Sequence, residues 1–101
     1  MTILVSVIKD ELDRNLRAQA AYLKELSQFP QGSLITKQRK SIDYVYLAYR
    51  DATNRVRTDY IGKQDNPTIK RLQQQIKKRQ EVIAILKELK QNELLIRKML
   101  K

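Results

Sequence analysis

Helix-breaking residues divide this chain into three parts. It contains only two prolines and two glycines, and all four lie in two short stretches, residues 30–32 and 62–67. Pro30 disfavours helical geometry in the residue before it, and Gly32 permits a sharp change of direction. Gly62 ends the middle part, and Pro67 suits the first position of a new helix. The chain is therefore predicted to have two outer segments and a middle segment of different character.

The two outer segments carry the apolar spacing of amphipathic helices. The first helix is predicted over about residues 6–28, with its apolar stripe at Val5, Ile8, Leu12, Leu16, Ala20, Leu23 and Leu26. A second helix is predicted to begin after the capping residues Asp65 and Asn66. It starts in a heptad-like rhythm at Ile69, Leu72, Ile76, Ile83 and Leu86. The stripe then drifts and widens, as in a straight helix that packs against several neighbours.

The middle segment is rich in β-branched and aromatic residues and contains two polar turn candidates. We predict three strands at about residues 34–37, 42–50 and 55–61, joined by turns at 38–41 and 51–54. The second strand is apolar or aromatic on both faces, which is typical of a central strand. The third alternates Val56, Thr58 and Tyr60 with charged residues, which is typical of an edge strand.

Together these patterns predict an α+β fold with a long N-terminal helix, a three-stranded antiparallel meander and a long C-terminal helix. A chain of 101 residues has the size of one domain. We divide this single domain, residues 1–101, into a helical segment at 1–29, a sheet at 33–62 and a basic helix at 66–101.

Residue types that carry much of enzyme chemistry are missing. The chain has no cysteine and no histidine, so it lacks thiol nucleophiles, the usual zinc ligands and the commonest general base. Ser33, Thr36 and Ser41 have no evident base to activate them, and the carboxylates of the middle segment are dispersed. We expect no enzyme activity, no catalytic residue, no metal, no cofactor and no small-molecule substrate.

The sequence shows no targeting or membrane-spanning pattern. The apolar run ILVSVI lacks a preceding basic segment and leads directly into acidic residues. No apolar run approaches the roughly 20 residues that a bilayer crossing needs. The expectation is a soluble, cytoplasmic protein with no membrane partner.

The net charge of +10 is concentrated after residue 32. Residues 1–32 contain four basic and four acidic side chains, residues 33–64 seven and three, and residues 65–101 ten and four. Such an excess attracts polyanions, and basic residues interleaved with tyrosines on a sheet can bind nucleic acid. The predicted phosphate contacts are Arg39, Lys40, Arg55, Arg57 and Lys63, with the phosphate backbone bound along a basic edge of the sheet, where Arg55 and Arg57 share one side of the third strand.

The same features also have a structural interpretation. Tyrosines on a sheet are more often core or rim residues whose hydroxyls reach water. The basic clusters at residues 70–71 and 77–79 can cover apolar surface with their stems while their charged ends stay solvated. Glu81 and Glu88 are then their local partners, and the charge serves solubility alone.

Three motifs of the middle segment resemble those of a known family: Gly32-Ser33-Leu34, YVYLAYR at residues 44–50, and YIGK at residues 60–63. The family consists of short prokaryotic proteins with no assigned function, in which these motifs precede a basic helix. The sheet pattern is also similar to the N-terminal, DNA-associated element of certain insertion-sequence transposases. The resemblance implies a helix, sheet, helix layout and adds weight to DNA association. It does not extend to the turns, which are QRKS and DATN here.

The end of the second helix is strongly apolar. Without a second chain to cover it, this end would be exposed beyond the small sheet. The predicted oligomer interface is Leu94, Leu95, Ile96, Met99 and Leu100, and a homodimer is the expected assembly.

The sequence thus supports two functions. One is a non-enzymatic nucleic-acid-associated protein of the mobile-element or regulatory kind, and the other is a homo-oligomeric interaction module with no nucleic-acid role.

Overall fold

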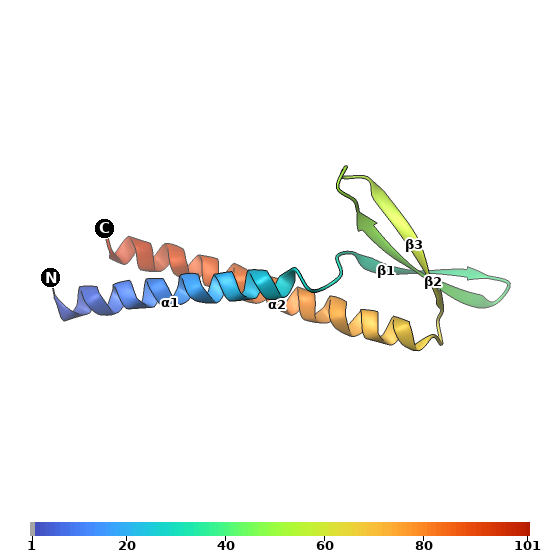
Figure 1. Ribbon diagram of the computed structural model, residues 1–101, viewed down its shortest axis with the longest axis horizontal. Coiled ribbons are helices and arrows are strands. Elements are labelled where there is room, and N and C mark those ends of the chain that lie inside the picture. Colours follow the sequence, from blue (N-terminus) through green and yellow to red (C-terminus); the bar gives the residue numbers. More distant parts are fainter. Residues whose placement is uncertain (1) are drawn as a thin grey trace. The chain divides into compact units, whose positions relative to one another are not determined.

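The computed structural model describes residues 2–101, which form, in sequence order, a helix, three strands and a second helix (Figure 1). Their order and bounds are α1 (Ile3–Leu26), β1 (Ser33–Arg39), β2 (Ile42–Arg50), β3 (Val56–Lys63) and α2 (Pro67–Met99). The strands form one antiparallel sheet in the order β1-β2-β3. The predicted α+β fold is confirmed, and so is the central position of the second strand.

The described chain forms two compact units. The sheet unit is Phe29–Arg79, which holds the three strands and the first part of α2. The helical unit combines α1 with Gln80–Lys101, which holds the rest of α2. Each unit buries its own small set of side chains.

In the helical unit, α1 and the last part of α2 lie side by side and run antiparallel (Figure 1). α1 begins at Ile3, three residues earlier than predicted. The cause is Thr2, whose hydroxyl oxygen accepts a hydrogen bond from the Val5 N–H at 3.3 Å and caps the helix. Apolar spacing alone does not reveal this helix start, because the capping residue is polar.

The two helices contact each other along positions that alternate in spacing between three and four, which is the repeat of a coiled coil. These positions are Val5, Ile8, Leu12, Asn15, Gln19, Tyr22 and Leu26 on α1 and Val82, Leu86, Leu89, Glu93 and Ile96 on α2, all buried or half-buried. Leu100, just past the end of α2, continues the spacing, and Ala18 of α1 is also half-buried. The predicted stripes are therefore only partly right. Leu16, Leu23 and Ile83 were expected in them but are 39%, 51% and 41% exposed, and Ala20 is exposed too.

In the sheet unit, α2 begins at the predicted capping site. The side-chain oxygen of Asn66 accepts a hydrogen bond from the Thr68 N–H at 2.9 Å. Pro67 occupies the first helical position, where a missing N–H removes no helical hydrogen bond. The start of this helix could thus be located from local sequence alone.

β1 and β2 form a tight hairpin. Arg39 pairs with Ile42, so the turn contains only Lys40 and Ser41. Their φ angles are 50° and 64°, and a type I′ hairpin turn requires two such positive values. The predicted four-residue turn is wrong, and β1 continues two residues beyond its predicted end. As a result, Arg39 lies in the sheet and Lys40 lies at the hairpin tip.

A β-bulge extends β3 beyond its predicted end at residue 61. Val45 pairs with Gly62 while Tyr46 pairs with Tyr60, so one strand has an additional residue here. Gly62 has a φ angle of 156°, and a Cβ atom on it would lie 2.5 Å from the side-chain nitrogen of Asn66. Only glycine permits this close approach to the α2 cap. The bulge continues the pairing to Lys63, which lies opposite Tyr44.

The interior of the sheet unit lies between one face of the sheet and the first part of α2. Val45 in β2 and Ile69 in α2 are each 2% exposed and are the largest fully buried side chains. Leu34 and Leu47, on the same sheet face as Val45, are half-buried. The hydrophobic effect therefore holds this face of the sheet against α2.

Candidate nucleic-acid interface

The strand register assigns the sheet residues to two faces, because directly opposed residues of an antiparallel pair share a face. The face toward the interior, here the inner face, carries Leu34, Thr36, Gln38, Asp43, Val45, Leu47, Tyr49, Arg57 and Asp59. The other, here the aromatic face, carries Ser33, Ile35, Lys37, Arg39, Ile42, Tyr44, Tyr46, Ala48, Arg50, Val56, Thr58, Tyr60 and Lys63.

Charge is segregated between the two faces. The cationic side chains of the aromatic face are Lys37, Arg39, Arg50 and Lys63. Both carboxylates of the strands, Asp43 and Asp59, lie on the inner face, so the aromatic face as described has none. Lys40 adds a further positive charge at the hairpin tip. The aromatic face therefore presents positive charge that no carboxylate of the same face neutralises.

Three tyrosines form a cluster on the aromatic face. The ring centroids of Tyr46 and Tyr60 lie 5.4 Å apart, and those of Tyr44 and Tyr60 lie 6.2 Å apart. The Lys37 ammonium lies 5.0 Å from the Tyr46 ring centroid, within cation–π range. Tyr60 is 56% exposed, whereas Tyr44 and Tyr46 are half-buried. The cluster thus lies at the surface and is not part of the interior around Val45.

A groove of about 410 Å³ runs along this cluster. Its lining residues are Arg39, Lys40, Ile42, Tyr44, Tyr46 and Tyr60. Apolar and aromatic surface forms its floor, and two cations from the β1–β2 hairpin border it. This combination suits a ligand that has both flat aromatic groups and negative charge.

The structure separates the five predicted phosphate contacts. It brings Arg39, Lys40 and Lys63 together with the tyrosines, at or beside the aromatic face. Arg57 instead lies on the inner face, and Arg55 precedes β3 in the turn after β2. Sequence reasoning missed Lys37, although its position two residues before Arg39 in a strand places both side chains on one face.

The Asp51 carboxylate organises the turn between β2 and β3. One of its oxygens accepts hydrogen bonds from the backbone N–H groups of Thr53 (2.9 Å) and Arg55 (3.1 Å). The other oxygen is paired with Arg57. The hydrogen bond from Arg57, followed by that from the Thr53 side chain, lowers the pKa of Asp51 to about 2 from an ordinary value of 3.8. Arg57 therefore has a structural role in this turn.

The lowered pKa of Asp51 predicts how the sheet unit responds to acid. A carboxyl group with a lower pKa in the folded than in the unfolded state stabilises the fold above the unfolded pKa. That stabilisation should be lost as the pH falls from about 4 to about 2. We expect Asp51→Asn to lower the melting temperature at pH 6 and to reduce its decline between pH 4 and pH 2, as measured by circular dichroism. Asp43→Asn removes the same charge from an exposed site, and parallel curves for both variants would contradict the role of Asp51.

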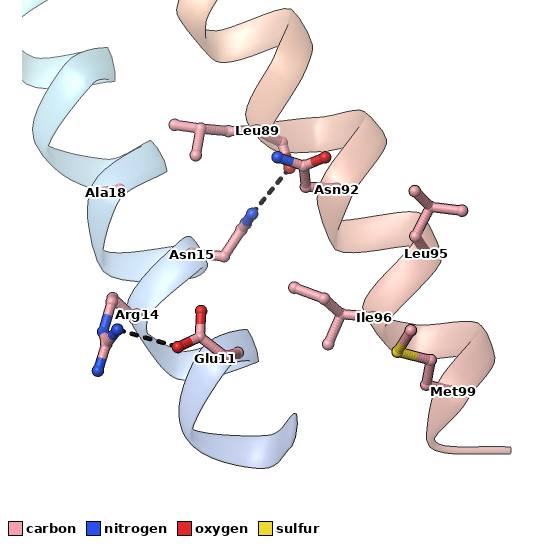
Figure 2. Close-up of a pocket in the computed structure, with 9 residues that line it drawn as sticks. All are labelled: Glu11, Arg14, Asn15, Ala18, Leu89, Asn92, Leu95, Ile96 and Met99. Carbon is pink, nitrogen blue, oxygen red and sulfur yellow. Dashed lines mark hydrogen bonds and ion pairs between the residues drawn. The ribbon is translucent and has the colours of Figure 1, made fainter. Parts of the chain in front are cut away.

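The helical unit has a second surface depression, a groove of about 440 Å³ between α1 and α2 (Figure 2). Its lining residues are Glu11, Arg14, Asn15, Ala18, Leu89, Asn92, Leu95, Ile96 and Met99. Figure 2 shows Asn15 of α1 directed at the backbone of α2, where its amide donates a hydrogen bond to the Leu89 carbonyl at 2.9 Å. The groove is mostly apolar on the α2 side.

A buried polar network lies beside this groove. The Gln19 amide donates hydrogen bonds to the side-chain oxygens of Asn15 (2.7 Å) and Glu93 (2.8 Å). These bonds satisfy Asn15 and Gln19, which are only 7% and 9% exposed. The hydrogen bond from Gln19, followed by that from Arg97, lowers the pKa of Glu93. Polar groups inside a helical pair fix which positions face each other, because a shifted register would leave them unsatisfied.

The predicted oligomer interface divides between two environments. Ile96 and Leu100 are half-buried at positions that face α1. Leu94, Leu95 and Met99 are 62%, 57% and 68% exposed. The last three are therefore available to another molecule, whereas the first two contribute to packing within the chain.

Within residues 2–101, no group of acidic side chains is arranged to hold a metal ion, and neither helix combines the length and apolarity needed to span a bilayer. The chain matches no family model, no curated protein sequence and no solved structure.

Proposed function

We propose that this protein is a non-enzymatic nucleic-acid-associated protein that binds a phosphate backbone through the aromatic face of its sheet. Arg39, Lys40 and Lys63 make the phosphate contacts, and Lys37 joins them. The resemblance of the strand motifs to the DNA-associated element of insertion-sequence transposases supports a mobile-element or regulatory role.

The observation that carries the proposal is the segregation of charge on the sheet. Cations that only improve solubility can lie on any exposed face, mixed with carboxylates. Here the exposed face has cations and tyrosines, and the strand carboxylates lie on the other side. Such a face attracts a polyanion and offers it flat contact area as well.

The experiment is a salt series of binding measurements by fluorescence anisotropy, with labelled oligonucleotides and the full chain. Binding to phosphates releases counterions, so the logarithm of the association constant should fall linearly with the logarithm of salt concentration. With three to four contacts, the slope should be roughly −2 to −4. The affinity of an apolar interface changes little with salt concentration. An association constant that does not depend on salt, or no binding at low salt, would therefore refute the proposal.

A second candidate function, self-association through the helical unit, has its own supporting observation. Among the described residues of this unit, the only buried apolar side chains are Val82 and Leu86. Leu94, Leu95 and Met99, near the C-terminal end of α2, are all more than half exposed. Covering these side chains with a second copy would provide burial that the unit lacks. This function is compatible with nucleic-acid binding, because it uses a different unit.

Substitution of exposed apolar residues on α2 should test self-association. We expect Leu95→Gln with Met99→Gln to raise the dimer dissociation constant by about 10- to 100-fold, since two side chains lose apolar burial. Sedimentation velocity at micromolar concentration measures this change. The control is Ile35→Gln with Val56→Gln, which removes two exposed apolar side chains from the sheet unit. A wild-type chain that is monomeric at these concentrations would exclude the dimer.

A further inference from the structure

We infer that the aromatic face binds single-stranded nucleic acid in preference to duplex, with unpaired bases stacked on Tyr46 and Tyr60. This inference rests on the proposed function and specifies its substrate class. It comes from the arrangement of rings and cations on the aromatic face.

Two neighbouring rows of the aromatic face bring cations and rings together. Across the three strands, Lys37, Tyr44 and Lys63 form one row, because Tyr44 pairs with both lysines. The next row is Ile35, Tyr46 and Tyr60. A row with a lysine on each side of a tyrosine therefore adjoins a row with two neighbouring rings. The phosphates of a bound strand would meet the lysines of the first row, and its bases would meet the rings of the second.

The tyrosine rings do not cover one another's flat faces completely. The Tyr46 and Tyr60 planes are inclined by 58°, and the Tyr44 and Tyr60 planes by 52°. Tilted rings leave part of each π-face uncovered by the other ring, unlike rings that stack in parallel, although the Lys37 ammonium lies over one face of Tyr46. Tyr60 is 56% exposed, so its free surface is open to a ligand. An exposed ring of this kind is a platform on which a base can stack.

Duplex nucleic acid cannot use such a platform without distortion. Its bases are stacked on each other inside the helix, and proteins reach only their edges through the grooves. An aromatic side chain can contact the flat side of a base only if the base is unpaired or unstacked, which costs free energy in a duplex. In a single strand the bases are already accessible. The tyrosines therefore favour single strands, whereas the cations alone would bind either form.

The test compares one mixed-sequence DNA strand of about 12 nucleotides, a length within the usual range of single-strand sites, with the same strand in a duplex. We expect the single strand to bind the full chain about tenfold or more tightly in anisotropy measurements at moderate salt. The chain has no tryptophan, and three of its five tyrosines lie on the aromatic face, so partial quenching of tyrosine emission reports stacking there. Emission should be quenched by the single strand.

Two variants test the role of the rings. Tyr46→Leu with Tyr60→Leu keeps apolar bulk but removes both platforms, so single-strand affinity should fall by about 10- to 100-fold. The salt slope should stay unchanged, because no charge is lost. Tyr46→Phe with Tyr60→Phe keeps the rings and should keep the affinity. Circular dichroism verifies that both variants are folded.

The possible outcomes separate the failure of this inference from the failure of the proposed function. Duplex binding as tight as single-strand binding overturns this inference and leaves the proposed function standing. Single-strand preference that survives in a folded leucine variant also overturns it, since the rings are then not the platform. Absence of binding to both oligonucleotides at low salt overturns the proposed function itself. If the leucine variant instead loses self-association in sedimentation, the aromatic face is a protein interface and the inference is wrong.

Discussion

Replacement of Arg39, Lys40 and Lys63 by glutamine is expected to weaken nucleic-acid binding by about 100-fold or more at ~0.1 M salt. All three cations lie at or beside the aromatic face, and two of them line its groove. Each lost phosphate contact should also make the salt slope shallower by about 0.7 to 0.9, so the triple variant should lose roughly two to three units. Folding should be preserved, because exposed charges contribute little stability. Anisotropy measured over a salt series determines both quantities.

A matched control separates a defined site from diffuse attraction. Lys87, Lys90 and Lys98 are exposed on α2 in the helical unit, and their replacement by glutamine removes the same charge. This control should weaken binding far less than the triple variant of the sheet. Equal weakening by both variants would show that net charge, and not the aromatic face, attracts the nucleic acid.

A second comparison distinguishes the two sides of the sheet. The sequence alone predicted that Arg55 and Arg57 contact phosphate. Because Arg57 is paired with Asp51 on the inner face, replacing Arg55 and Arg57 should have a smaller effect on affinity than replacing Arg39 and Lys63. The reverse order would assign binding to the β3 edge as first predicted.

Ile69→Ala is expected to destabilise the sheet unit by about 2 to 4 kcal/mol, which is typical of removing a buried isoleucine side chain. Ile69 is 2% exposed and is the main buried side chain that α2 contributes to this unit. A cavity between helix and sheet would remain in its place. Denaturant unfolding followed by circular dichroism measures the loss, and a small domain has little stability to spare.

The control for this prediction lies on the same helix. Ile83 is 41% exposed, so Ile83→Ala makes the same chemical change outside an interior and should cost less than about 1 kcal/mol. If both variants lose equal stability, α2 does not form the second layer of the sheet unit. Loss of oligonucleotide binding in the Ile69 variant, at temperatures where it is unfolded, would connect the fold to the aromatic face.

The order of elements was predictable because strong local signals mark the boundaries between the helices and the sheet. The prolines and glycines end or begin each segment, and Asn66 caps α2 with the hydrogen bond that its residue type predicts. The central position of β2 followed from its two apolar faces. Such signals depend on a few neighbouring residues, so a single sequence contains them in full.

Helix packing was predicted less well, because it depends on contacts between distant residues. Asn15 and Gln19 occupy buried positions of α1, whereas the prediction chose the more apolar Leu16, Ala20 and Leu23. The polar pair is tolerated there because Leu89 and Glu93 supply hydrogen-bond partners from 74 residues away in the chain. No local pattern reveals such partners.

The candidate site was predicted in part for the same reason. Basic residues among tyrosines were visible in the sequence, but the division between the two faces depends on register. The bulge at Gly62 shifts that register by one residue and places Lys63 opposite Tyr44. The partner of Arg57 also became evident only when the turn brought Asp51 to it. Composition therefore indicated that the site lies in the middle segment, but the strand pairing determines which basic residues share a face with the tyrosines.

The most direct test of the aromatic face is an NMR titration of the isotope-labelled full chain with the single-stranded DNA described above. We predict that the largest shift changes occur at the cations Lys37, Arg39, Lys40 and Lys63 and at the tyrosines Tyr44, Tyr46 and Tyr60. Smaller changes are expected at the inner-face residues Asp43 and Arg57. Changes concentrated instead on α2 around Lys77 and Lys78, or spread evenly over all basic residues, would contradict a nucleic-acid site on this face.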